Sequence, residues 1–145
     1  MTVDYDTASL LRETGLGVEM AIYSFDELLE RVRNPALKKI ITEARNDHKR
    51  LQDENNNLMK AYELIPPEAG AMAKGMAWME TNMKMTMEDS DRVIANIITK
   101  GCDTGTRNLH RYINEHAMAD PAVANTAKKL IQLEENLEED LRLYL

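Results

Sequence analysis

Four polar residues stand where the helical periodicity of this chain calls for an apolar side chain. They are His48, Asn55, His116 and Glu134. Glu19 lies one step from such a position, beside Val18. Counting back from a turn at Asn34 places His48 about level with Ile22 and within a turn or so of Glu19, so these two side chains could meet. Carboxylates and imidazoles brought together in this way can hold Fe(II) or Mn(II).

Most of these polar residues also have a purely structural interpretation. Asn55 is about level with Gly15, whose missing side chain leaves room for a buried amide that sets the helix register. His116 lies close to the second turn, and we expect it to be structural and partly wet. Cys102 has Lys100 nearby, which could lower its pKa, but a buried and idle thiol is the simpler interpretation.

The elements that position these residues follow from apolar stripes with alternating steps of three and four. The first stripe is Leu11, Gly15, Val18, Ile22, Phe25, Leu29 and Val32. The second is Leu37, Ile41, Ala44, His48, Leu51, Asn55, Leu58, Tyr62 and Ile65. The last is Val123, Ala127, Leu130, Glu134, Leu137, Leu141 and Tyr144. Before the last stripe, residues 88–119 are predicted to form a further helix, with a kink or break near Gly101 and Gly105. Its inward residues are expected to be Val93, Ile97, Leu109, Ile113 and His116.

A repeated turn relates the two halves of the chain. Asn34-Pro35-Ala36-Leu37 returns as Asp120-Pro121-Ala122-Val123, 86 residues later. An Asx residue caps a helix well, and proline fits its first turn because no N–H is needed there. The repeat predicts two helical hairpins, about 5–33/36–64 and 88–119/122–145, in one domain that covers residues 1–145.

Residues 66–87 carry six of the ten methionines, and we expect a Met-rich crossover helix at about 69–87. Met72, Met76, Met79 and Met83 form one stripe, with Trp78 beside it. The stripe could fill gaps over the bundle, form a surface for a protein partner or a dimer, or bind a soft metal.

Composition narrows the class of protein. The chain has 25 acidic against 18 basic residues, a net charge of −7, which argues against binding nucleic acid or an anionic membrane. One cysteine excludes an internal disulfide and suits a reducing compartment. The acidic N-terminus shows no signal peptide, and no apolar run reaches the roughly 20 residues that span a bilayer. We therefore expect a soluble cytoplasmic protein.

Several segments carry a resemblance to a known family. Gly17-Val18-Glu19-Met20-Ala21 with Tyr23 resembles the first-helix region of the ferritin/rubrerythrin superfamily, and Lys100-Gly101-Cys102 through Tyr112 resembles its third helix. Residues 90–112, together with Trp78, are most similar to small ferritin-like domains of unassigned function. The resemblance implies an all-α, ferritin-like antiparallel four-helix bundle.

In di-iron members of that superfamily, two helices each supply a Glu and two each supply a Glu-x-x-His pair. The resemblance assigns Glu19 to the first Glu and His48 to the first His. Arg45 stands where the partner Glu belongs, and Cys102 or Gly105 stands in place of the third-helix Glu. On the last helix the 86-residue offset selects Glu134, and a looser alignment selects the pair Glu135 and Glu138.

Two functions follow. Arg45 cannot lose its proton, so it could replace the metal by pairing with Glu19, Glu134 or Glu138. The chain would then be a non-catalytic bundle without a cofactor, a structural or protein-interaction module and a homodimer, with a degenerate di-metal site. The alternative is an Fe or Mn protein with a reduced ligand set from Glu19, His48, Glu134 and Glu138, in which Arg45 turns outward.

Overall fold

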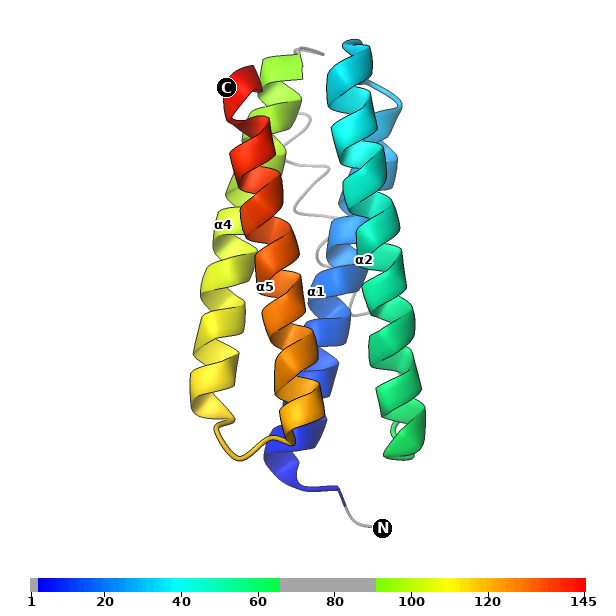
Figure 1. Ribbon diagram of the computed structural model, residues 1–145, viewed down its shortest axis with the longest axis vertical. Coiled ribbons are helices and arrows are strands. Elements are labelled where there is room, and N and C mark those ends of the chain that lie inside the picture. Colours follow the sequence, from blue (N-terminus) through cyan, green and yellow to red (C-terminus); the bar gives the residue numbers. More distant parts are fainter. Residues whose placement is uncertain (1–2, 66–90) are drawn as a thin grey trace.

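The computed structural model describes residues 3–65 and 91–145, and four long helices run through them (Figure 1). They are α1 (Tyr5–Leu29), α2 (Pro35–Ala61), α4 (Asp91–Glu115) and α5 (Pro121–Leu141), and a short 3-10 helix, η1 (Arg142–Tyr144), follows α5. The all-α bundle expected from the sequence is confirmed for these residues. The crossover helix predicted at 69–87, including the Met72–Met83 stripe, lies outside the described residues.

The helix starts follow from local sequence chemistry. Asp4 caps α1 by accepting the Thr7 N–H at 2.7 Å, and Asn34 caps α2 by accepting the Ala36 N–H at 2.8 Å. Pro35 and Pro121 both stand at the beginning of their helices. Asp120 does not cap α5 with its side chain, and its carboxylate instead accepts a hydrogen bond from Tyr62.

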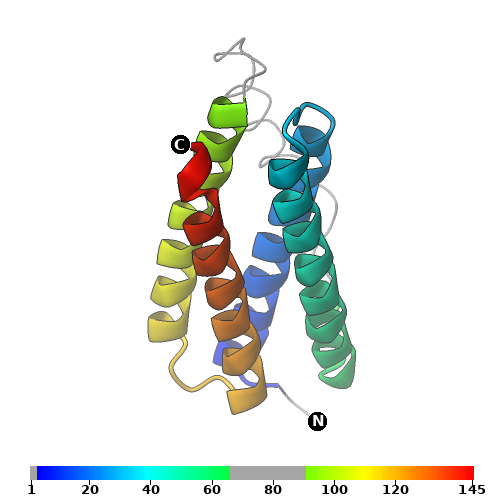
Figure 2. The ribbon, with the colours of Figure 1, turned by 45° about the horizontal axis from the view of Figure 1, so that its top comes forward.

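The two hairpins, α1 with α2 and α4 with α5, pack side by side (Figure 2). The end of α2 and the start of α4 lie at opposite ends of the bundle, so α2 and α4 run in the same direction (Figure 1). Helix α2 also packs against α5, and α1 packs against α4. Each of these four neighbouring pairs is therefore antiparallel.

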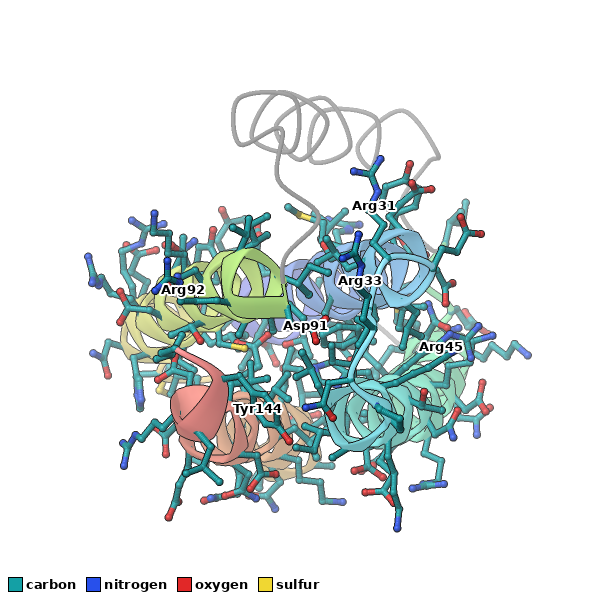
Figure 3. All side chains as sticks on the ribbon, turned by 90° about the horizontal axis from the view of Figure 1, so that it is seen from above. Arg31, Arg33, Arg45, Asp91, Arg92 and Tyr144 are labelled. Carbon is teal, nitrogen blue, oxygen red and sulfur yellow. The ribbon has the colours of Figure 1, made fainter. Side chains whose placement is uncertain are left out.

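Polar contacts at both ends fix the register between the hairpins. At one end, Asp6 of α1 pairs with His116 at 3.1 Å, as expected for a structural and partly buried histidine. At the other end, the Asp91 carboxylate accepts the N–H groups of Arg33 and Asn34, both at 2.9 Å. Seen from above, Asp91 lies close to Arg33, beside the turn between α1 and α2 (Figure 3).

The apolar stripes predict most of the core, but the ends of the first two stripes are wrong. Leu28 and Met59 are buried there in place of Leu29 and Leu58, which are only half-buried. Ile65, the last residue of the second stripe, is 83% exposed. The first six positions of the last stripe are buried, from Val123 to Leu141. In the first half of α4, Ile94 and Ile98 are the buried residues, whereas the predicted Val93 and Ile97 are half-buried, with Ile97 packed at the edge of the core. The helix also continues through Gly101 and Gly105 without the expected break.

Candidate functional site: the interior around Glu134 and the α1–α4 cavity

The register brings the predicted site residues to one level of the bundle. Because Asp6 meets His116 in antiparallel α1 and α4, Glu19 is about level with Cys102. Lys129 of α5 pairs with Glu54 of α2 at 2.9 Å, which places His48 about level with Glu134. One polar or sulfur-bearing side chain from each helix thus lies near the middle of the bundle.

His48 is fully buried, and only one of its two ring nitrogens has a hydrogen-bond partner. Its Nδ1 lies 2.7 Å from the Ala44 carbonyl oxygen, to which the ring donates in its Nδ1–H tautomer. The ring of Phe25 meets it edge-on, with 5.0 Å between ring centroids. The other nitrogen, Nε2, has no hydrogen-bond partner, and burial lowers the pKa of the imidazole. His48 is therefore a neutral ring with one open acceptor atom.

Glu134 is a buried carboxyl group with only 6% of its surface exposed. Its Oε2 atom has no hydrogen-bond partner. Burial, and then the nearby Glu138 carboxylate, raise the pKa of Glu134 to about 8. At neutral pH this side chain is mainly a protonated acid.

A glycine of α4 makes the room for that carboxyl group. A Cβ atom built on Gly105 would stand 2.5 Å from Oε2 of Glu134, far closer than two such atoms approach. Cys102, one turn earlier on α4, is buried as expected, and burial together with Glu134 and Glu138 raises the pKa of its thiol. Cys102 is therefore a protonated thiol rather than a nucleophile.

Arg45 does not enter this interior, and the prediction that it replaces a metal there is wrong. Its guanidinium pairs with Asp26 of α1. Figure 3 shows the Arg45 side chain directed away from the bundle axis, along the outer side of α2. Three residues of helix turn Arg45 by about 60° from the inward direction of His48, and this turn carries it to the outer edge of the α1–α2 contact.

The remaining acids occupy less buried positions. Glu19 is half-buried, its Oε2 atom has no partner, and burial raises the pKa of the carboxyl group. Glu138 also has one buried oxygen without a partner, whereas Glu135 faces outward near His110 at 4.0 Å. Within residues 3–65 and 91–145, no three His, Cys, Asp or Glu side chains stand close enough to hold a metal ion. The donor set therefore does not fit the two-metal centre of the superfamily that the sequence resembles.

A cavity of about 470 Å³ lies between α1 and α4 and reaches Glu134 of α5. Its walls are mostly apolar, and three glycines stand among the lining residues: Gly17, Gly101 and Gly105. A Cβ atom at Gly101 would meet nothing within 4 Å, so this part of the wall is open. The sequence pattern held a signal for this cavity, small residues on two neighbouring helices, but we interpreted the α4 glycines as a kink.

A larger and shallower depression, about 970 Å³, lies between α2 and α5. Charged side chains line it, and among them Lys129 and Glu54 pair with each other. Although it is bigger, it is open to solvent and holds none of the buried, unpartnered polar atoms described above. The α1–α4 cavity is the better candidate for a specific site.

Comparisons with protein-family models, with curated proteins and with solved structures found no match to this chain. Among the helices that the structure describes, none combines the length and the apolar character needed to cross a membrane. The class that these observations define is an all-α bundle of two helical hairpins with a cavity beside a buried acid.

Proposed function

We propose that this chain is a non-catalytic, ferritin-like binding module that takes an apolar small molecule into the cavity between α1 and α4. The observation that carries the proposal is an apolar space of about 470 Å³ that ends at one buried, unpartnered carboxyl group. Cavities of this size and lining bind small ligands by removing apolar surface from water, and one polar group fixes the orientation.

The helix directions support the ferritin-like part of the proposal. One long connection joins two parallel helices, α2 and α4, while the neighbouring helices run antiparallel, which is the arrangement of ferritin-like bundles. The state of the interior groups supports a non-catalytic role. The Cys102 thiol is held protonated by burial, so it is not activated as a nucleophile.

A cavity-filling variant tests the binding. Gly101→Phe places a ring on an open part of the wall, and Gly101→Ala is the matched control, because it changes the same backbone position without filling the space. Titration with Nile red, a neutral apolar dye whose fluorescence rises away from water, measures the occupancy. We expect the wild type and Gly101→Ala to bind alike and Gly101→Phe to bind at least about tenfold more weakly. Equal binding by all three proteins would show that the cavity is not the site.

A second candidate is a single metal ion, Fe(II) or Mn(II), held by Glu19, His48 and Glu134. The observation that favours it is that each of these side chains has a buried polar atom without a partner. The side chains would have to move together to bind one ion. Metal analysis of the purified protein tests it, followed by thermal melting with added Fe(II) or Mn(II). Stabilisation by metal that His48→Ala abolishes would support this candidate.

The homodimer expected from the sequence remains a prediction, as does a partner surface at Met72–Met83, which lies outside the described residues. Light scattering of the full chain tests the first. A dimer that Met76→Lys and Met83→Lys together convert to a monomer would connect the two.

A further inference from the structure

The cavity between α1 and α4 has an unusual charge pattern for an apolar space. Its lining contains two carboxyl groups, Glu13 and Glu134, and no lysine, arginine or histidine among the residues that the structure describes. Three aromatic residues also line it: Tyr23, Phe25 and Tyr112. Carboxyl groups and aromatic faces both attract cations, and an apolar wall excludes water from them.

Glu134 supplies the specific contact point. The residue is 94% buried, and its unpartnered Oε2 atom is packed against Gly105, where a Cβ atom would stand only 2.5 Å away. A buried oxygen without a partner costs free energy, which a ligand that donates a hydrogen bond would recover. A charged donor would gain more than a neutral one, because Glu134 can become an anion.

We propose that the ligand of this cavity is an apolar organic amine, whose protonated nitrogen pairs with Glu134 while its hydrocarbon part lies between α1 and α4. This inference rests on the proposed binding function and names the class of ligand that the cavity takes. A carboxylate ligand is disfavoured, because it would bring a third acid beside Glu13 and Glu134. A neutral alcohol satisfies Oε2 but gains no charge pairing.

Binding moves one proton. The amine enters as an ammonium ion and keeps its proton, whereas the Glu134 carboxyl group releases its proton to solvent and becomes the paired carboxylate. With a pKa of about 8, Glu134 is about nine-tenths protonated at pH 7, so close to one proton leaves for each amine bound. At pH 9 the same step releases only about a tenth of a proton.

Other titratable groups surround Glu134, and the pH dependence depends on which of them changes charge. Glu138 on α5 and Cys102 on α4 interact with it electrostatically. Glu19 of α1 and His48 of α2 lie at about its level, and Glu13 of α1 lines the same cavity. His48 has a lowered pKa and Cys102 a raised one, so neither changes charge between pH 7 and pH 9. Glu13 lines the same cavity as a second carboxyl group, so a variant at this position is included below.

Three eight-carbon probes test the inference: octylamine, octanol and octanoate. Displacement of Nile red measures the binding of each probe to the wild type, to Glu134→Gln and to Glu135→Gln. Glu135 is the exposed neighbour on the same helix, so Glu135→Gln is the control. At pH 8.5 we expect octylamine to bind the wild type and Glu135→Gln about tenfold more tightly than octanol, with octanoate weakest. In Glu134→Gln the preference for the amine should vanish while Nile red and octanol still bind.

Proton release gives an independent readout. Calorimetry of octylamine binding at pH 7, in buffers with different ionisation heats, should report nearly one proton for the wild type and none for Glu134→Gln. Equal affinity for octylamine and octanol in the wild type, with normal Nile red binding, would overturn the amine proposal and leave the binding module intact. A preference for the amine that Glu13→Gln abolishes and Glu134→Gln keeps would overturn it as well. Failure of Nile red itself to bind would overturn both proposals.

Discussion

The two hairpins carry the same repeat but treat their central polar residue in opposite ways. His48 of α2 and Glu134 of α5 stand 86 residues apart at equivalent positions of the repeat. His48 is held by the Ala44 carbonyl oxygen and by the ring of Phe25. Glu134 faces Gly105, whose counterpart in the first hairpin is Glu19, and it borders a cavity. The residue opposite, rather than the repeated backbone, decides whether this level of a hairpin is filled or hollow.

A second glycine sharpens the comparison within the first hairpin. Gly15 of α1 faces Asn55, whose Nδ2 lies 3.0 Å from where a Cβ atom would stand, as the sequence predicted. There the amide donates to the Leu11 carbonyl oxygen at 3.1 Å, so the space is used by a hydrogen bond within the hairpin. Gly105 makes room for Glu134 in the same way, but the Oε2 atom of Glu134 has no hydrogen-bond partner there. Both glycines thus make room for a polar side chain of a neighbouring helix, but the amide at Gly15 donates a hydrogen bond, whereas Oε2 at Gly105 has no partner.

The largest expected effect is the pH dependence of stability that Glu134 causes. Its pKa is about 8 in the folded chain and near 4.5 in the unfolded chain, so its contribution is fully present below about pH 4.5 and is lost as the pH rises through 8. Glu134→Gln removes the cost of charging the buried acid, so the variant should gain on the wild type by about 3–5 kcal/mol between pH 4.5 and pH 9.

Urea unfolding at several pH values measures this difference in the free energy of unfolding. Glu135→Gln, on the exposed side of the same helix, is the control and should follow the wild type. Parallel curves for the wild type and Glu134→Gln would mean that the carboxyl group reaches solvent, and the contrast between the two hairpins would disappear.

The next effect concerns the space at Gly105. Gly105→Leu should push Glu134 out of its position and destabilise the chain by about 2–3 kcal/mol, because the new side chain begins 2.5 Å from Oε2. Gly101→Leu is the matched control, since its side chain meets nothing near the backbone, and it should gain about 1 kcal/mol from helix propensity alone.

A double variant separates steric conflict from any general intolerance of leucine at position 105. Gly105→Leu combined with Glu134→Ala should recover most of the lost stability, because the two side chains then share the space. Thermal melting measures the four proteins of this cycle: the wild type, Gly105→Leu, Glu134→Ala and the double variant. Additive losses in the double variant would show that Glu134 is not what Gly105 accommodates.

The fold was predictable where one stripe alone could face the core. In the second half of α5, polar or charged residues surround Leu137 and Leu141, and this leaves one inward face. In the first half of α4, the apolar pairs Val93-Ile94 and Ile97-Ile98 give two overlapping stripes. Local sequence cannot choose between them, and the packing against α1 and α5 decides.

The sequence predicted the height of the site residues along the bundle, but not the direction in which each side chain points. Spacing placed His48 and Glu134 inward, and both are buried. Spacing alone could not tell that Arg45, three residues before His48, finds Asp26 outside the bundle. The cavity was missed because a glycine in a helix signals a kink, a close approach or an open wall equally well, and only the neighbouring helix distinguishes them.

His48 should show a pH dependence of opposite sign to that of Glu134. Burial lowers its pKa in the folded chain, so its contribution is present above the ordinary pKa of 6.5 and is lost as the pH falls below it. Relative to His48→Leu, the wild type should lose up to about 1.4 kcal/mol for each pH unit below 6.5, until the folded ring itself is charged.

Acid unfolding of the two proteins, followed by circular dichroism, measures this slope. His116→Leu is a contrasting variant, because that ring pairs with Asp6 at the end of the bundle. A His48→Leu variant whose stability runs parallel to the wild type between pH 4.5 and pH 7 would mean that His48 is charged at no cost, contrary to its full burial.

The smallest expected effect on stability is that of Arg45→Ala, and it tests whether the Arg45 guanidinium lies outside the bundle. The Arg45–Asp26 pair is on the outer side of α1 and α2, where water screens it, so Arg45→Ala should leave the melting temperature nearly unchanged. A guanidinium among Glu19, Glu134 and Glu138 would behave differently, since its removal would leave buried acids uncompensated and raise the pKa of Glu134 further. The titration of Glu134, followed by carbon NMR of its carboxyl group, should therefore be the same in Arg45→Ala as in the wild type. A higher pKa of Glu134 in Arg45→Ala than in the wild type would show that Arg45 lies in the interior beside Glu134, and the contrast between the two hairpins would then be wrong.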